Sequence, residues 1–334
     1  MALKRLILPK HILREIEKTE PDTERRPMAP HTSYSQLATY LRCSMQYYLK
    51  YVVHLPDKPK VSTSLGKGGH AALEWNTKHK LNVGEDRPED ELVQKASDFM
   101  DFYLSDMPFS EYEKDAEPGQ LKDKQIAATR IYRRRDAPKI IPVGAEVELN
   151  VDINPYVPDQ FKELLDRPVR TVNMKIDVLY KDTETMVQDH DQGVTVGVED
   201  YKYVTRKKTQ AEVNTSPQIT TYMAGMKDLT GKWLTKAGIR MMHPGSMAKK
   251  PKSADAIPDS IALLREPEHM TPEALTRRMT RVAVQFAQAE RGIREGIFIP
   301  TDDPQTCSWC PVRDRCQSSL VDDFEAMKIR EKTG

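Results

Sequence analysis

The hydrophobic and polar positions of this chain follow a helical period before residue 138, and strand periods alternate with helical ones after it. In residues 33–52 apolar side chains recur every three or four positions behind Ser33, a residue suited to capping a helix. This pattern predicts a first helix that contains Cys43. A glycine-rich stretch is expected to form a loop before the second helix. The further helices are predicted over about 68–80, 88–105 and 119–135.

Beyond residue 138, alternating apolar and polar positions predict β-strands. The strands are expected over 139–153, 169–180, 194–205 and, as the last one, 236–244. A polar stretch joins the second and third strands, which we expect to pair as a hairpin. Helices are predicted over 215–231, capped by Ser216 or Thr215, and over 271–296, capped by Thr271. Helices followed by a strand-rich centre indicate an α/β (α+β) fold.

The same pattern divides the chain into four segments. We expect a flexible arm over 1–30, a helical region over 31–138, a β-rich core over 139–245, and a C-terminal region over 246–334 with a long helix and a cysteine loop. No segment reaches the about 20 apolar residues that span a bilayer, and the first residues do not form a convincing signal peptide. We therefore expect a cytoplasmic protein without membrane contact.

Composition changes this picture in one respect. The net charge of +1 over 334 residues excludes a general polycation, so contact with nucleic acid must come from local basic patches. Such patches occur at 130–135, 205–208, 249–252 and 277–281. A phosphate-binding loop at "GKGG" is excluded, because Gly68 follows Lys67 where that loop requires Ser or Thr.

Two carboxylates and an amine stand on the predicted hairpin. Asp177 lies in "KIDVLY", and Asp200 and Lys202 lie in "EDYKYV". Alternation along a strand puts Asp200 and Lys202 on one face and Tyr201 on the other. Such a trio suits metal-assisted hydrolysis of a phosphodiester. The alternative is an ordinary ladder of opposite charges on a sheet surface, worth about 0.2–1 kcal/mol.

These residues, with "QITTY" after them and "GKGGH" before them, resemble the RecB-like branch of the PD-(D/E)xK nuclease superfamily. The resemblance implies a restriction-endonuclease-like mixed β-sheet core over 139–245 that is flanked by helices. It implies Mg²⁺ or Mn²⁺ ligands at His70, Asp177, Asp200 and the backbone carbonyl of Tyr201, and a catalytic role for Lys202. It also implies that Gln218 and Tyr222 brace the site or contact DNA. Further candidates are Glu146 and Glu74, and Glu199 is an alternative to its neighbour Asp200.

The four cysteines form a second pattern. Cys307, Cys310 and Cys316 lie in "TCSWCPVRDRC", and Cys43 is the one remaining thiol. One early cysteine and three late ones resemble the iron–sulfur subset of the same branch, which includes AddB-type and CRISPR-associated exonucleases and phage proteins. The resemblance implies a [4Fe–4S] cluster that joins the N- and C-terminal segments, with a stabilisation of about 4–5 kcal/mol. Zinc and unligated thiols remain alternatives.

Together these observations predict a metal-dependent DNA exonuclease. We expect it to act on single strands or duplex ends in recombination, repair or replication, in a bacterium or a phage-infected cell. No helicase motif is present, so a helicase or recombination partner would be a separate chain. The alternatives are a non-catalytic DNA-binding or assembly subunit and an iron–sulfur redox carrier. Tyr47, Tyr48 and Trp75 are candidates for stacking on bases.

Overall fold

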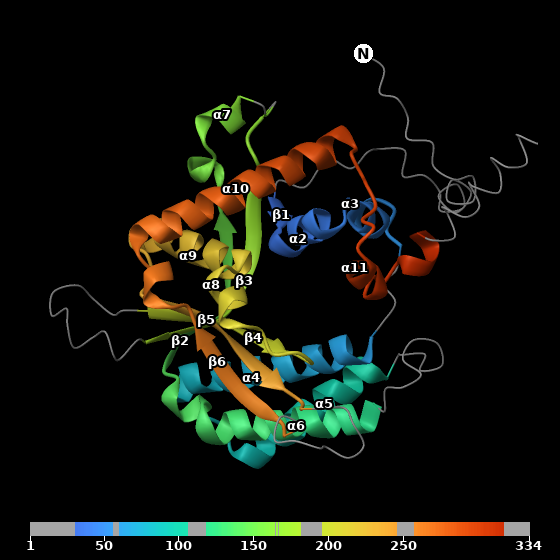
Figure 1. Cartoon of the computed structure of the whole chain (residues 1–334). Helices are drawn as coiled ribbons and strands as arrows, with labels where there is room; N and C mark the ends of the chain where they lie inside the picture. Colours follow the sequence, from blue (N-terminus) through green and yellow to red (C-terminus); the bar gives the residue numbers. More distant parts are fainter. Residues whose placement is uncertain are drawn as a thin grey trace, which may run out of the picture. The chain divides into compact units, whose positions relative to one another are not determined.

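The structure is a computed structural model that describes residues 31–55, 60–105, 118–163, 165, 167–181, 196–245 and 257–316 (Figure 1). The chain forms two compact units. Unit 1 combines residues 1–58 with 288–334, and unit 2 comprises 59–287. The predicted arm over 1–30 and the basic patch at 249–252 lie outside the described residues.

Unit 2 is built on a mixed β-sheet. Its strands are β2 (Pro142–Val151), β3 (Thr171–Lys181), β4 (Val196–Tyr203), β5 (Lys236–His243) and β6 (Asp259–Leu264). β2 pairs antiparallel with β3, β3 with β4 and β5 with β6, whereas β4 and β5 are parallel. This mixed sheet with its flanking helices confirms the predicted fold class and the predicted antiparallel pairing of 169–180 with 194–205.

The prediction that 236–244 is the last strand was wrong, because β6 follows it and pairs with β5. β6 has the sequence DSIALL, in which four apolar residues follow one another without apolar–polar alternation. A short edge strand of this kind is identified by its pairing with a neighbouring strand, because its own sequence pattern does not indicate it. The connection between β3 and β4 lies outside the described residues.

Helices cover the sheet of unit 2 (Figure 1). α4 (Val61–Val83), α5 (Glu89–Leu104) and α6 (Pro118–Arg135) pack on one another, α4 contacts β2 and β4, and α6 contacts β5 and β6. α9 (Pro217–Thr230) contacts β2 and β5. The remaining helical segments are α7 (Asp159–Lys162), α8 (Gln210–Asn214), α10 (Pro272–Glu295) and the 3₁₀ turns Ala137–Lys139, Asn154–Tyr156 and Pro267–His269.

The capping signals predicted for two helices are confirmed. Ser216 accepts a hydrogen bond from the backbone N–H of Ile219 at the start of α9, and Thr271 accepts one from Ala274 at the start of α10. The helix α9 ends at Gly231, whose φ of 75° is a left-handed conformation that glycine adopts without strain. These signals are local, which is why the sequence places these helices within a few residues.

The prediction of a glycine loop before residue 68 was wrong, because α4 begins at Val61 and runs through the glycines. A Cβ on Gly68 would stand 2.6 Å from the backbone nitrogen of Met100 in α5, and one on Gly69 would overlap the ring of Tyr203 in β4. The glycines therefore serve the close packing of α4 on its neighbours.

In unit 1, the predicted first helix is interrupted at Cys43. α2 (Tyr34–Arg42) ends there, and α3 (Ser44–Tyr47) and a π-helical turn (Tyr48–Val52) follow, after the short strand β1 (His31–Ser33). Cys43 is extended, with φ −160° and ψ 107°, and its sulfur accepts the N–H of Gln46 at 3.4 Å. The expectation that Cys43 lies inside a helix was wrong, because its thiol caps α3 instead.

The early helices of unit 1 bind the segment that follows α10. The hydroxyl of Tyr40 donates to the carbonyl of Ile297 at 2.7 Å, and that of Ser44 donates to the carbonyl of Ile299 at 3.0 Å. Phe298 stacks on Tyr47 with ring centroids 6.3 Å apart and an interplanar angle of 13°. These contacts hold the chain just before α11 (Pro304–Ser308), which contains the first cysteine of the tail.

Within the described part of the chain, no helix is both long and apolar enough to cross a membrane.

Candidate active site

Three neighbouring strands bring three carboxylates into one row. The register of β2 on β3 places Glu146 opposite Asp177, since the residues on either side of each are paired with one another. On the other side of β3, Val178 pairs with Glu199, so Asp200 follows beside Asp177. Directly opposed residues on neighbouring strands project to the same face. The sheet therefore presents the carboxylates together at the point where β3 and β4 stop pairing.

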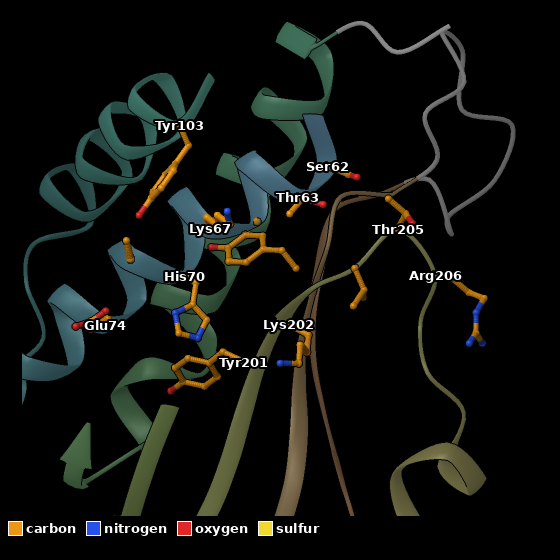
Figure 2. Close-up of a pocket in the computed structure, with 14 residues that line it drawn as sticks. Ser62, Thr63, Lys67, His70, Glu74, Tyr103, Tyr201, Lys202, Thr205 and Arg206 are labelled. Carbon is orange, nitrogen blue, oxygen red and sulfur yellow. The ribbon is translucent and has the colours of Figure 1, made fainter. Parts of the chain in front are cut away.

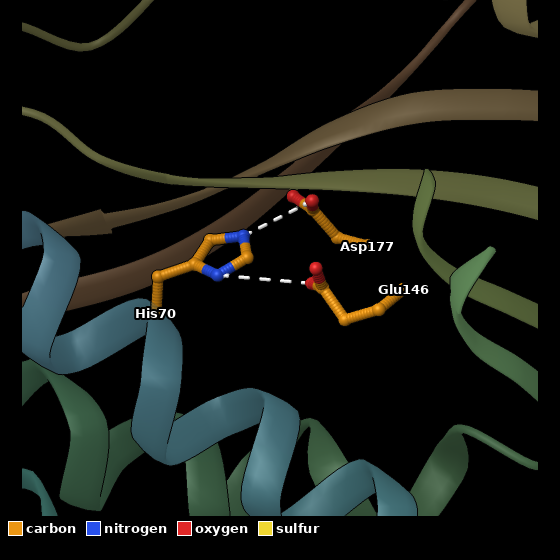
Figure 3. Close-up of side chains that lie close together, drawn as sticks. All are labelled: His70, Glu146 and Asp177. Atoms are coloured by element: carbon orange, nitrogen blue, oxygen red, sulfur yellow. Dashed lines mark ion pairs between the residues drawn. The ribbon is translucent and has the colours of Figure 1, made fainter. Parts of the chain in front are cut away.

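His70 reaches this row from α4 (Figure 3). Its Nε2 lies 3.0 Å from Oδ1 of Asp177, and its Nδ1 lies 3.9 Å from Oε1 of Glu146. One ligand atom from each of these three side chains falls within 4.8 Å of the others. Burial lowers the pKa of His70, but the hydrogen bond and charge of Asp177 and the charge of Glu146 raise it to a net higher value. The two carboxylates thus favour the protonated form of His70 in the metal-free site.

Asp177 is held through one oxygen and presents the other. The backbone N–H of Tyr201 donates to its Oδ2 at 2.5 Å, while Oδ1 faces His70. Glu146 shows the same division: its Oε2 lies 3.3 Å from the amine of Lys175, and its buried Oε1 has no hydrogen-bond partner among the described residues. Both side chains are thereby oriented before any ligand binds.

Asp200 is fixed in a similar way from α9 and from its own strand. Its Oδ1 accepts from Nε2 of Gln218 at 3.0 Å and from the amine of Lys202 at 3.0 Å. The hydroxyl of Tyr222 lies 3.3 Å from the same oxygen and makes a shorter bond, 2.6 Å, to the backbone carbonyl of Lys175. Gln218 and Tyr222 are four residues apart on α9, and their side chains bond at 2.8 Å. Oδ2 of Asp200 is buried without a hydrogen-bond partner in the described structure.

These orphaned oxygens fit a divalent cation. The row offers one unpartnered or outward oxygen from each carboxylate and an imidazole nitrogen, and carboxylate oxygens are the ligands that Mg²⁺ and Mn²⁺ prefer. Buried carboxylate oxygens without partners are otherwise costly. The side chains of this site whose ligand atoms all lie within 4.8 Å of one another are His70, Glu146 and Asp177, and Asp200 is not in that group.

The carboxyl group of Asp200 has a raised pKa in this site. Burial raises its pKa to about 6, and the charge of Asp177 adds to this effect, while the neighbouring ammonium of Lys202 opposes it. The hydroxyl of Tyr222 also has a raised pKa, first because it is buried and then because of the charges of Asp200 and Asp177. Tyr222 therefore stays a neutral hydrogen-bond donor at physiological pH.

Glu146 has a backbone conformation that is rare for its residue type. Its φ of 52° lies in the left-handed region, although it stands in the middle of β2. Such a conformation costs a non-glycine residue on the order of 1 kcal/mol or more and persists where the surroundings enforce it. Sequence patterns gave Glu146 only as a further candidate, an acid on the strand before the predicted hairpin, and they contained no signal of the positive φ.

Glu199 and Tyr201 face away from this row. The guanidinium of Arg240 donates to Glu199 at 2.6 and 3.0 Å, in a buried ion pair that also includes Asp136 at 3.1 Å. The Tyr201 side chain packs in the core with Tyr132, and their hydroxyls bond at 3.0 Å. Glu199 thus has a different partner, and its neighbour Asp200 takes the position beside Asp177.

Glu74 lies one turn beyond His70 on α4, at the edge of a hollow beside the site (Figure 2). Its carboxylate forms an ion pair with Lys78 at 2.5 Å. The structure therefore places Glu74 near the row without bringing it into the group formed by His70, Glu146 and Asp177.

The four cysteines all belong to unit 1, and each is half-buried and free of disulfide bonds. Burial raises the pKa of Cys310, and it raises that of Cys316 to about 11, with further contributions from the charges of the other thiols. The sulfur of Cys43 accepts a backbone N–H, and so does that of Cys310, from Val312. Within the described residues, no three of these sulfurs lie within 4.8 Å of one another.

A comparison with protein families finds one match of nearly full length. The family model of the PD-(D/E)XK nuclease superfamily matches residues 31–317. A search of curated proteins finds no match.

Proposed function

The chain belongs to the PD-(D/E)XK nuclease superfamily, which implies a metal-dependent nuclease with DNA as substrate, and from this premise we propose that it is an exonuclease. The observation that supports metal-dependent phosphodiester hydrolysis is the row of Glu146, Asp177 and Asp200, and the preference for DNA ends is the part that the cleavage assay below tests. Each carboxylate is oriented through one oxygen, and His70 and Lys202 lie beside the row. These residues would hold Mg²⁺ or Mn²⁺.

When bound, such an ion activates a water molecule and neutralises charge on the scissile phosphate. The chain's own residues orient the participants. Tyr201 fixes Asp177 through its backbone N–H, and Gln218 and Tyr222 fix Asp200. Lys202 lines the hollow, and its side chain is about one third exposed (37%). Its amine is positioned to donate a hydrogen bond to the attacking water or to a phosphate oxygen.

The roles of individual residues follow from this arrangement. We assign metal binding to His70, Asp177, Asp200 and Glu146, and the catalytic amine to Lys202. The backbone carbonyl of Tyr201 remains a predicted ligand, supported by its position between Asp200 and Lys202. The inclusion of Glu146 is supported by its unpartnered oxygen and its strained backbone.

The proposal is tested by cleavage of end-labelled linear and circular single-stranded DNA in Mg²⁺ or Mn²⁺. The wild-type protein should degrade linear DNA and leave circles intact. Lys202→Ala should lose about 100-fold or more in rate, as expected when a transition-state donor is removed, and should retain DNA binding. Lys162→Ala, a surface lysine away from the row, is the matched control. A wild-type protein that binds DNA and cleaves none would instead support the non-catalytic subunit.

We also propose that Cys43, Cys307, Cys310 and Cys316 bind a [4Fe–4S] cluster. Four half-buried thiols in one compact unit, two of which accept backbone N–H groups, support this assignment. Tetrahedral zinc sites are usually built from two close cysteine pairs, whereas here one cysteine lies early in the chain and three lie late. Anaerobic purification should give a brown protein with about four irons and four sulfides per chain. A colourless protein with stoichiometric zinc would refute the assignment.

A further inference from the structure

A hollow of about 710 Å³ is lined by His70 and Lys202 of the candidate site (Figure 2). Residues of α4 form one wall, and β4 with the residues that follow it forms another. Tyr103, at the end of α5, stands at its edge. Sites for small organic ligands have volumes of about 300–1,000 Å³, so this space suits a nucleotide or two of a single strand. His70 and Lys202 are shared between the hollow and the metal site.

The hollow is rich in cationic groups. Lys67, Lys202 and Arg206 line it, against the single carboxylate of Glu74, which is already paired with Lys78. Arg206 is bound to Glu212 at 2.5 Å. Lys67 is exposed, and no carboxylate of a described residue pairs with it. An unpaired ammonium in such a place is suited to a phosphate.

Lys67 also has a defined position relative to the metal site. It precedes His70 by three residues on α4, so both side chains lie on the same helix face, about 5 Å apart along the axis. This is the scale on which neighbouring phosphates follow one another along a strand. If the phosphate to be cleaved lies at His70, the next one along the strand lies within reach of Lys67.

The start of α4 adds to this positive field. Ser62 and Thr63, in its first turn, line the same hollow. The preceding residue, Lys60, occupies the N-cap position but has no side-chain acceptor for the first backbone N–H groups. The N-terminus of a long helix carries a partial positive charge and donates N–H groups to anions.

Tyr103 gives the hollow an aromatic edge. Its side chain remains 37% exposed, and the neighbouring Phe102, 70% exposed, packs edge-on against it with ring centroids 5.4 Å apart. By contrast, the ring of Trp75 is covered by the guanidinium of Arg87 at 3.8 Å. Tyr103 is therefore the aromatic group placed to stack on a base.

We propose that this hollow binds the nucleotide next to the cleaved bond, with its base stacked on Tyr103 and its phosphate held by Lys67. In a duplex the faces of each base are covered by its stacked neighbours, so stacking on Tyr103 favours an unpaired base and a single strand at this position. The inference rests on the proposed nuclease function and specifies how that site chooses its substrate. Tyr103 and Lys67 are positioning residues that contact the substrate away from the reacting atoms.

Equilibrium binding without cleavage tests the subsite. We would measure the affinity of a short fluorescein-labelled oligothymidylate in EDTA by fluorescence anisotropy. Tyr103→Ala should weaken binding about 10-fold, and Tyr103→Phe should keep wild-type affinity because the ring remains. Binding to a blunt duplex of the same length should not change. Tyr156→Ala, an aromatic substitution elsewhere in unit 2, is the matched control, and thermal denaturation verifies that each variant is folded.

Two further measurements separate stacking from the phosphate contact. Oligonucleotides with an abasic site moved stepwise from the end should lose affinity at one position in the wild type and show no such loss in Tyr103→Ala. Lys67→Ala should weaken binding and lower the salt slope by about 0.7, the value for one single-strand phosphate contact. Lys162→Ala should do neither.

The outcomes keep the two proposals apart. If the wild type cleaves DNA but Tyr103→Ala and Lys67→Ala bind single strands as tightly as it does, the subsite is wrong and the nuclease stands. Equal losses on single strands and duplexes would also overturn the subsite. If the wild type cleaves no DNA, the nuclease proposal fails, while the binding series still decides whether the hollow holds an unpaired nucleotide.

Discussion

Asp200 is a carboxylate that the fold buries completely while leaving one of its oxygens without a partner among the described residues. Burial raises its pKa from 3.8 to about 6. An acid with a higher pKa in the folded than in the unfolded state destabilises the fold when it is ionised. This cost is absent below about pH 4 and complete above the folded pKa. The metal-free protein should therefore lose stability between these values as the pH rises.

We expect Asp200→Asn to increase the free energy of unfolding of the metal-free protein at pH 7. Because one pKa unit corresponds to about 1.4 kcal/mol, the gain should be on the order of 2–3 kcal/mol, and it should nearly vanish at pH 4. Urea denaturation in EDTA at both pH values measures it. Asp159→Asn, at a side chain that is 92% exposed, should change neither value. An equal effect of Asp200→Asn at both pH values would contradict the expectation.

The sequence predicts part of this site because alternation on a strand is a local rule. Asp200 and Lys202 are two residues apart, and hairpin pairing brings Asp177 beside them. The alternation rule does not predict the position of Glu146, since its φ of 52° breaks the regular conformation of β2. The rule also does not predict the partner of Glu199, because Arg240 lies on β5, far from Glu199 in the sequence.

At the scale of elements, the glycines of α4 illustrate how a neighbour can override a local signal. "GKGG" is typical of a loop, yet Gly68 lies within α4, where its missing side chain leaves room for the backbone of α5. The glycine at position 68 is explained by the packing of α5, which the sequence does not show. The sequence alone therefore predicted the start of α4 seven residues too late. Lys67 consequently lies on a helix face with His70, which the loop interpretation did not provide.

Gly68→Ala should destabilise unit 2, although alanine favours a helix by about 1 kcal/mol over glycine. The new Cβ would lie 2.6 Å from the backbone nitrogen of Met100, which cannot move as a flexible side chain does. Overpacking of this kind costs about 1–3 kcal/mol. Urea denaturation would measure the change. Gly119→Ala in α6 is the matched control, because nothing lies within 4 Å of its Cβ, and it should be neutral or slightly stabilising.

The strand β4 is anchored by the buried pair of Glu199 and Arg240. Arg240→Met leaves the carboxylate of Glu199 buried and uncompensated, which should cost about 3–5 kcal/mol. The double variant Glu199→Leu/Arg240→Met should recover most of this loss, because both charges are then removed. Thermal denaturation of the two single variants and the double variant gives the coupling. Additive losses would show that the pair does not stabilise the strand.

At the scale of the whole molecule, the two candidate metal centres belong to different units. The carboxylate row lies in residues 59–287, whereas the cysteines lie in a unit built from both ends of the described chain. The spacing of the cysteines predicts that the ends come together, since ligands of one centre must meet. The boundary between the units falls inside α10, where a continuous helical pattern gives no sign of it.

This separation predicts that the centres can be removed independently. Cys43→Ser should eliminate the visible absorption and lower the stability of unit 1, because one cluster ligand is lost. It should leave the affinity of the carboxylate site for Mn²⁺ within about twofold, since His70, Glu146 and Asp177 are oriented by contacts within unit 2. Asp177→Asn should have the opposite profile, with intact absorption and Mn²⁺ binding weakened about 10-fold or more. Mn²⁺ titration by electron paramagnetic resonance and limited proteolysis measure both. If Cys43→Ser abolished Mn²⁺ binding while unit 2 resisted protease, the cysteines would be part of the nuclease site and not a separate support.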